Sequence, residues 1–254
     1  MNFYFELLHG TFSLFHILFM IFGTAFLVVS MILLHKYVKE EKAQRIVLMI
    51  AAGLTLFIAI LNRIWATIGD VQDGHSWLMF LPHSVCSLAV FVITISVLVG
   101  KKNNAVSYSA FIYALFGGFS NIVYPDTLNE YPGLPFRTLT SLFFHFFMFW
   151  LVIYMLLIGY FKFTMKKIYY PLIFYCVAIT LGVFEMQNLG FAPKECMNIG
   201  ASLLDSFPIL TSWYALGIGF FLGHVIYTII HNLVVDKMTL KQILTFQDPP
   251  QLAA

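Results

Sequence analysis

Cys86, His83 and His145 are the residues of this sequence whose types could support covalent catalysis. His83 and Cys86 lie three residues apart in the apolar segment 77–87, and His145 stands between two pairs of phenylalanines. A cysteine thiolate that attacks and a histidine that takes up the thiol proton are the minimum for nucleophilic thiol catalysis. Cys86 and His145 are therefore the candidate catalytic residues, and such a pair could pass a fatty acyl group through a thioester.

Further polar residues interrupt apolar segments and are candidates for orienting the catalytic pair or a substrate. They are His83, Asn121, Arg137, Glu185 and Asn188. Polar and ionisable groups are costly inside a membrane, so each is a functional candidate by default. Each also has a purely structural interpretation. A cysteine packs as a small hydrophobe, a lone histidine hydrogen-bonds within a core, and Glu185 could pair with Arg63.

The composition indicates the medium in which these residues lie. The chain has 254 residues, of which 60% are hydrophobic and 10% charged, with a net charge of +2. Soluble globular chains carry about 25% charged residues. This balance excludes a soluble enzyme, a disordered regulator and a nucleic-acid binder, because so much apolar surface cannot be hidden from water without lipid. The three cysteines cannot form a disulfide framework.

Seven apolar stretches are each long enough to cross a bilayer, which takes about 20 residues. They are continuous rather than alternating, and backbone inside lipid must satisfy its own hydrogen bonds, so they are predicted to be helices. The sequence therefore predicts an all-α polytopic membrane protein. It has one domain over residues 1–254 with seven transmembrane helices, at 12–34, 46–67, 77–99, 105–124, 139–161, 168–189 and 208–230.

The loops between these segments differ strongly in charge. One side holds eleven Lys and Arg residues, whereas the other side holds only Arg63, Arg137 and Lys194. The positive-inside rule then places the N-terminus outside and the C-terminus in the cytoplasm, in agreement with an odd number of crossings. The longer loops lie on the outer side, and irregular loops often carry function. We therefore expect the functional site in the outer leaflet.

Helix geometry places the candidate residues at similar depth. Cys86 is expected roughly 10–14 Å below the outer end of the third segment, on one helix face with His83. His145 is expected about 9 Å into the fifth segment. Both segments begin outside and run parallel, so the Cys86 thiol is the expected polar partner of His145 if the two helices are neighbours. The pair Gly117-Gly118 in the fourth segment permits close helix contact.

Two other site types of seven-span proteins fit the sequence poorly. Retinal proteins need a buried lysine in the last segment, which this chain lacks. Zinc hydrolases need clustered ligands, but His224 in the last segment lies roughly 15 Å deeper than His145, and one metal ion with bonds near ~2 Å cannot bridge that gap. A looser outer group of Asp73, His75 and His83 matches no established ligand pattern. No metal and no cofactor is therefore predicted.

Several short motifs resemble, in order, those of one membrane protein family. The segment Leu-Pro-His-Ser-Val-Cys-Ser-Leu at 81–88 resembles the Leu-Pro-x-His-Leu-Cys segment of the YwaF-like bacterial integral membrane proteins. These proteins are grouped with the animal transmembrane protein 164 acyltransferases. Further matches follow over residues 77–230, at the Gly-Gly and Pro125-Asp126 stretch, Phe136-Arg137, the segment 143–145, the segment 188–190 and the turn 204–208.

This resemblance implies a seven-helix membrane protein. For the animal members it also implies transfer of a polyunsaturated acyl chain to an ether lysophospholipid through a catalytic cysteine and histidine, and these roles fall on Cys86 and His145. The sequence departs from the bacterial pattern at Ser84, where a histidine is usual. His83 stands one place earlier, about 100° around a helix.

The residues and the resemblance together predict a coenzyme-independent lipid acyltransferase in the bacterial plasma membrane. The acyl group would be held on Cys86, with His145 as general base and then general acid. Asn121 or Arg137 would orient the histidine or a phosphate headgroup. Membrane lipids are the expected partners, and nucleic acid is not. The alternatives are a transporter or sensor that binds a small ligand in its polar core, and a structural subunit of a membrane complex.

Overall fold

The structure is a computed structural model, and it describes residues 10–69, 80–82, 84–125, 128, 136–189 and 213–249. These residues are mostly helical and contain no strand, which confirms the all-α prediction. The long helices are α2 (Leu14–Tyr37), α3 (Glu41–Gly69), α5 (Ala105–Val123), α7 (Phe136–Leu157), α8 (Tyr170–Leu189) and α10 (Trp213–Val234). The shorter elements are α4 (Val85–Val99), the 3-10 helix η3 (Met165–Lys167) and α11 (Leu240–Leu244).

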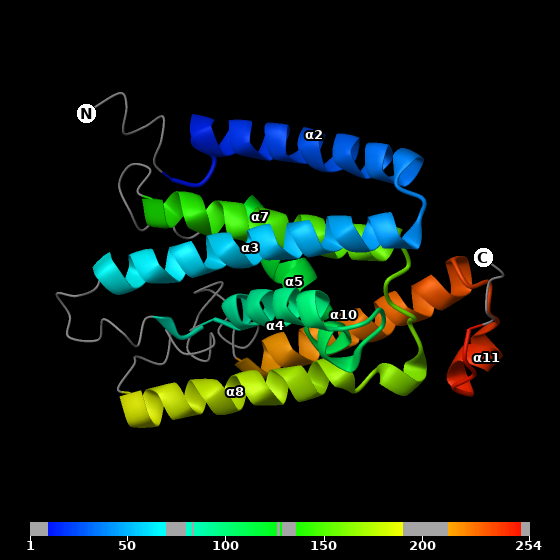
Figure 1. The fold of residues 1–254 in the computed structure, drawn as a ribbon. Coiled ribbons are helices and arrows are strands. Elements are labelled where there is room, and N and C mark those ends of the chain that lie inside the picture. Colours follow the sequence, from blue (N-terminus) through cyan, green and yellow to red (C-terminus); the bar gives the residue numbers. More distant parts are fainter. Residues whose placement is uncertain are drawn as a thin grey trace.

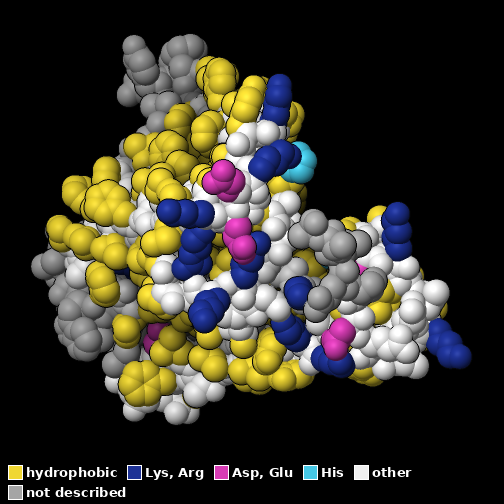
Figure 2. Space-filling model, turned by 45° about the vertical axis from the view of Figure 1, so that its right-hand side comes forward, with side chains coloured by type: hydrophobic (Ala, Val, Ile, Leu, Met, Phe, Trp, Pro, Cys, Tyr) yellow, Lys and Arg dark blue, Asp and Glu magenta, His cyan; other side chains and the backbone are white. Residues whose placement is uncertain are grey.

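The chain is a multi-pass integral membrane protein. Six helices in the described part of the chain are long and apolar enough to cross a bilayer. Large apolar side chains such as Phe22, Ile50 and Val177 stay exposed on them, and such side chains cover much of the face seen in Figure 2. The remaining predicted segment corresponds to α4, which has 15 residues and is therefore about 22 Å long. Seven crossings and the orientation of the termini stay predictions.

Four helices form the centre of the bundle. α3 packs against α4 and α7, and α5 packs against the same two helices, so α4 and α7 lie diagonally in this central group. α2 packs on α7, α8 packs on α5, and α10 packs on α8 and α5. Figure 1 shows the helices lying side by side, with the start of α2 and the end of α10 at opposite ends of the bundle. Buried aromatic side chains such as Tyr108, Phe111, Tyr113 and Tyr154 fill the interior.

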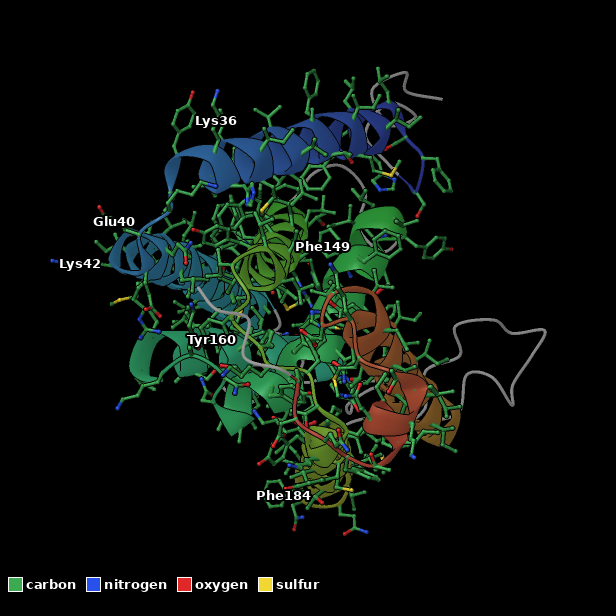
Figure 3. The ribbon with its side chains drawn as sticks, turned by 90° about the vertical axis from the view of Figure 1, so that its right-hand side faces the viewer. Lys36, Glu40, Lys42, Phe149, Tyr160 and Phe184 are labelled. Atoms are coloured by element: carbon green, nitrogen blue, oxygen red, sulfur yellow. The ribbon has the colours of Figure 1, made fainter. Side chains whose placement is uncertain are left out.

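Basic side chains gather at one end of the bundle, called here the basic end. It includes Lys36 at the end of α2, Lys42 at the start of α3, Lys101 after α4 and Lys162 after α7. Figure 2 shows Lys and Arg side chains grouped on this part of the surface, and Figure 3 looks at the bundle from this end. It is the end that the positive-inside rule assigns to the cytoplasm.

The third predicted segment begins later than the hydropathy suggests. α4 starts at Val85 rather than at residue 77, so residues 80–82 are not α-helical. Ser84 is the N-cap residue, and its hydroxyl accepts the backbone N–H of Ser87 at 3.1 Å. A capping serine two residues after Pro82 starts a helix, because it satisfies an N–H group that has no partner within the helix. The prediction that Cys86 lies roughly 10–14 Å into its helix is therefore wrong.

The other boundaries differ by a few residues. α7 ends at Leu157 rather than at residue 161, because Gly159 has a positive φ of +60°. The N–H of Tyr160 bonds the carbonyl of Met155 at 2.8 Å, and the N–H of Gly159 bonds that of Leu156. These two bonds form a Schellman cap, which terminates the helix. The predicted start of the last segment at residue 208 lies outside the described residues.

Candidate functional site

Cys86 lies in the first turn of α4, two residues after the N-cap residue Ser84. It is half-buried, and it packs against Gly117 of α5. A Cβ atom added at Gly117 would lie 2.6 Å from Cys86 Sγ, which is closer than Cβ atoms come in proteins. The glycine therefore allows α4 and α5 to approach closely, as the sequence predicts. The start of a helix is also a favourable place for a thiolate, because the positive end of the helix dipole lies there.

The next glycine brings α7 equally close to α5. A Cβ atom at Gly118 would lie 2.9 Å from the carbonyl oxygen of His145 and 2.8 Å from Cβ of Phe149. Consecutive residues differ by only about 1.5 Å along a helix, so Cys86 and His145 lie at the same level of the bundle. Their helices are diagonal in the central group rather than packed side by side. The two side chains can therefore meet only through the interior of that group.

His145 is buried, with 6% of its surface exposed. Its Nδ1 atom lies 2.8 Å from the carbonyl oxygen of Ser141, one turn earlier on α7. A carbonyl oxygen only accepts hydrogen bonds, so Nδ1 carries the hydrogen and a neutral ring keeps its lone pair on Nε2. The polar partner of Nδ1 is thus this carbonyl and not the thiol. Nε2 is therefore the ring nitrogen whose lone pair is available for a proton.

Arg63 of α3 connects the helices around this level. Its guanidinium donates a hydrogen bond to the hydroxyl of Ser87 on α4. It also lies within electrostatic range of Glu185 on α8 and of Arg137 and His145 on α7. The sequence places Arg63 near a helix end on the outer side and offers its pairing with Glu185, but it does not predict the hydrogen bond to Ser87. An arginine at the end of an apolar segment is the sequence signal that identifies Arg63 as a candidate.

The charged neighbours of Arg63 are Glu185 on α8 and Arg137 on α7. Glu185 is fully buried on α8, and its proximity to Arg63 agrees with the structural interpretation of that carboxylate. The backbone carbonyl of Arg137 accepts a hydrogen bond from Asn62 Nδ2 at 2.9 Å, and Asn62 also donates to Thr140 at 2.9 Å. The guanidinium groups of Arg63 and Arg137 and the carboxylate of Glu185 together carry a net positive charge, which suits an anionic phosphate group.

The structure does not bring all predicted residues together. Asn121 lies one turn beyond Gly117 on α5, and its Oδ1 atom is buried without a hydrogen-bond partner among the described residues. Asn188 is exposed and donates to the carbonyl of Phe184 on its own helix at 3.2 Å, so it does not join the site. Phe184 projects outward from α8 (Figure 3). His83 lies outside the described residues.

His224 lies in another part of the bundle. Its ring packs against Tyr108 and Phe111, which belong to the half of α5 nearer the basic end. This position agrees with the depth predicted from the helix rise. In the part of the chain that the structure describes, no three His, Cys, Asp or Glu side chains gather as metal ligands would.

Residues 11–230 match the model of the TMEM164 family. The chain belongs to this family. The matched range contains the whole central group of helices and with it Arg63, Cys86, His145 and Glu185. Comparison with curated proteins and with solved structures gave no match. Membership of the TMEM164 family confirms the predicted resemblance, whereas the YwaF-like bacterial branch and the plasma membrane stay predictions.

The close contact at Gly117 gives a prediction for this TMEM164 family member. In Gly117→Ala the new methyl group meets Cys86 Sγ, so the thiol must move. We expect the rate of any reaction at Cys86 to fall by about 10²-fold, the effect of misplacing a reacting group by about 1 Å. Gly53→Ala on α3 is the matched control, because nothing lies within 4 Å of its added Cβ. The measurement is the rate of alkylation of Cys86 in a Cys176→Ser, Cys196→Ser background. Equal rates in the two glycine variants would contradict the packing described here.

Proposed function

We propose that the chain transfers fatty acyl groups between membrane lipids through a thioester on Cys86, without a coenzyme. The observation that supports this most is the common level of Cys86 and His145 on either side of the pair Gly117-Gly118. A thiol at a helix start and a buried histidine with its lone pair on Nε2 are suited to nucleophilic acyl transfer. Both reactants are lipids of the same bilayer, and they reach an intramembrane site sideways.

The proposed reaction has two half-reactions that conserve atoms and protons. In the first, Nε2 of His145 takes the thiol proton of Cys86, and the sulfur attacks the ester carbonyl carbon of a phospholipid. The C–O bond of the ester breaks, and His145 returns the proton to the departing lysophospholipid oxygen. In the second, His145 takes the proton of an acceptor hydroxyl, and that oxygen attacks the thioester carbonyl. The C–S bond breaks, a new ester forms, and the proton returns to Cys86.

The neighbouring polar groups have positioning roles in this proposal. Arg63 is fixed by Ser87 and lies near Glu185, so its guanidinium is available to stabilise negative charge at the reacting carbonyl or on a lipid phosphate. The Oδ1 atom of Asn121 is an acceptor for the hydroxyl of an incoming lysophospholipid, because it has no partner among the described residues.

An acyl exchange assay tests the proposal. The purified chain is reconstituted in vesicles that contain a phosphatidylcholine with a labelled acyl chain and an unlabelled lysophosphatidylethanolamine, without coenzyme A. We expect the label to appear in diacyl phosphatidylethanolamine in proportion to the amount of protein. If labelled free fatty acid appears without labelled phosphatidylethanolamine, the protein hydrolyses the phospholipid and does not transfer its acyl group. If correctly folded protein forms no labelled product, the proposed enzymatic function is wrong and the chain is better explained as a ligand-binding protein.

A further inference from the structure

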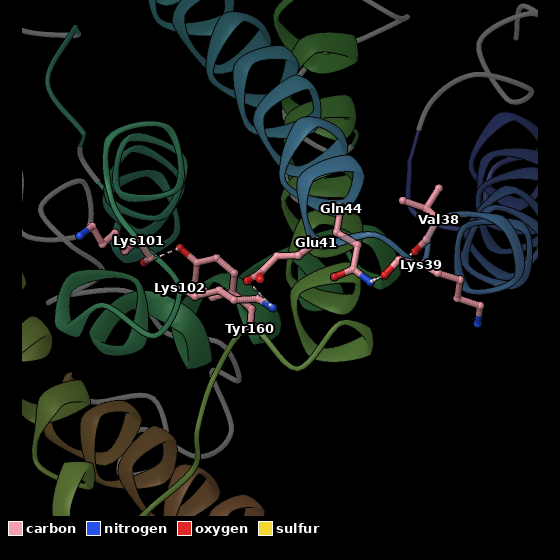
Figure 4. Close-up of polar contacts among 7 residues, drawn as sticks. All are labelled: Val38, Lys39, Glu41, Gln44, Lys101, Lys102 and Tyr160. Atoms are coloured by element: carbon pink, nitrogen blue, oxygen red, sulfur yellow. Dashed lines mark hydrogen bonds and ion pairs between the residues drawn. The ribbon is translucent and has the colours of Figure 1, made fainter. Parts of the chain in front are cut away.

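A hollow of about 620 Å³ opens at the basic end of the bundle, between the start of α3, the loop after α4 and the end of α7. Its polar lining consists mainly of Lys42, Arg45, Lys101 and Lys102, with Glu41 and Tyr160 beside them. Figure 4 shows several of these side chains, and Figure 3 shows Lys42 projecting from the start of α3. We call this hollow the basic pocket. It lies at the end of α4 opposite Cys86, about 20 Å away along that helix.

Hydrogen bonds hold the walls of the basic pocket. Arg45 donates to the carbonyl of Leu98 near the end of α4 at 3.4 Å. The hydroxyl of Tyr160 donates to the carbonyl of Lys101 at 3.1 Å and accepts from Asn104 at 3.2 Å. These bonds join α3, the loop after α4 and the segment after α7. The pocket is therefore a feature of the packed bundle rather than a chance grouping of surface lysines.

The charges of the pocket are unbalanced. Among the described residues of its lining, Glu41 is the only carboxylate, and it pairs with Lys102 at 3.3 Å. Within the described part of the chain, no carboxylate pairs with Lys42, Arg45 or Lys101. Unpaired Lys and Arg groups at the edge of a membrane attract phosphate, and they donate charge-assisted hydrogen bonds to it. The pocket thus has the chemistry of a phosphate-binding site.

An apolar groove meets the basic pocket at Gly100. The groove has a volume of about 400 Å³ and runs along α4, lined by Phe91, Ile95, Val99 and Val106 among others. Ile95, Val99 and Val106 are exposed on the lateral surface, which faces the acyl chains of the bilayer. A cationic hollow that continues into an apolar groove is complementary to an amphiphile, with an anionic head and a hydrocarbon tail.

We propose that the basic pocket binds the headgroup of an anionic phospholipid whose acyl chain lies in the groove along α4. Lys42, Arg45 and Lys101 contact the phosphate, and the lipid seals the end of α4 against α3 and α7. The bound lipid is not the acyl donor, because its headgroup lies at the end of α4 opposite Cys86. The site is therefore independent of the proposed acyl transfer.

Native mass spectrometry of the full chain tests this site. The protein is released from a detergent that contains equal amounts of phosphatidylglycerol and phosphatidylcholine, and the lipid adducts are counted. We expect phosphatidylglycerol to be retained preferentially, and Lys42→Gln/Lys101→Gln to lower its apparent affinity by about tenfold or more. Lys36→Gln/Lys39→Gln is the matched control, because it removes the same charge from exposed lysines of the same end that do not line the pocket. The control should stay within about twofold of wild type.

Three outcomes would overturn the proposal. Equal loss in both double variants would show general attraction to positive charge rather than a site. Displacement of the lipid by inorganic phosphate or glycerophosphate at the concentration of phosphatidylglycerol would show a phosphate site that does not need the groove. Unchanged binding in Lys42→Gln/Lys101→Gln would exclude the pocket itself. Cys86→Ser should bind phosphatidylglycerol as wild type does, whatever the result of the acyl exchange assay.

Discussion

Replacing Cys86 by serine is expected to lower acyl transfer by about 10³-fold or more, as loss of the nucleophile does in acyl-transfer enzymes. Serine keeps the size of the side chain against Gly117, but its hydroxyl is a far weaker nucleophile than a thiolate. The N-cap of α4 is provided by Ser84 and does not involve Cys86. Expression, elution volume and thermal stability should therefore stay near those of wild type. The measurement is the rate of label transfer in the acyl exchange assay.

The control for this variant is Cys176→Ser. Cys176 is exposed on α8, and it lies in the second turn of that helix, counted from the end nearer the basic end. Transfer by this variant should equal transfer by wild type. Wild-type activity in Cys86→Ser would mean that Cys86 only packs against α5, and the thioester mechanism would then be wrong.

Replacing His145 by alanine is expected to lower acyl transfer by about 10²–10⁴-fold, the usual contribution of a positioned general acid–base group. It should also slow the alkylation of Cys86 by a small neutral reagent at neutral pH, because the base that takes up the thiol proton is lost. His145→Gln is the second variant, since its longer side chain fills more of the space that alanine leaves. Alkylation rates between pH 6 and 9 are the measurement, and we expect the midpoint to move upward in both variants.

His224→Ala is the matched control for this experiment. His224 is also a buried histidine of an apolar helix, but it packs against Tyr108 and Phe111. Its removal should leave the alkylation of Cys86 unchanged. If His83→Ala slows the alkylation of Cys86 and His145→Ala does not, the base is His83 rather than His145. The pair His83 and Cys86, three residues apart in the sequence, would then be the better candidate site.

The sequence predicts the helices and the membrane well, because both depend on the continuous apolar composition of each segment. It predicts the start of α4 poorly, since hydropathy does not detect a helix cap. Residues 77–82 are as apolar as a helix, but Ser84 caps α4 and Pro82 precedes the cap. The end of α7 at Gly159 is likewise set by a glycine with positive φ rather than by polarity.

Part of the site follows from the sequence and part depends on packing. The pair Gly117-Gly118 predicts close helix contact, and it is this pair that brings Cys86 and His145 to one level. Hydropathy cannot tell which helices are neighbours, so the diagonal relation of α4 and α7 could not be predicted. The sequence offers the pairing of Arg63 with Glu185, but the hydrogen bond from Arg63 to Ser87 could not be predicted, because a charge at a segment end faces water or the bundle depending on the packing around it.

Intact-protein mass spectrometry detects a thioester on Cys86 by its added mass. The chain is purified rapidly from membranes after incubation with a phospholipid and without an acceptor, and half of the sample is treated with neutral hydroxylamine. We predict an added mass equal to one acyl chain, located on Cys86 by peptide mapping, removed by hydroxylamine and absent from Cys86→Ser. A wild-type protein that turns over labelled lipid without any hydroxylamine-labile adduct on Cys86 would rule out the thioester mechanism.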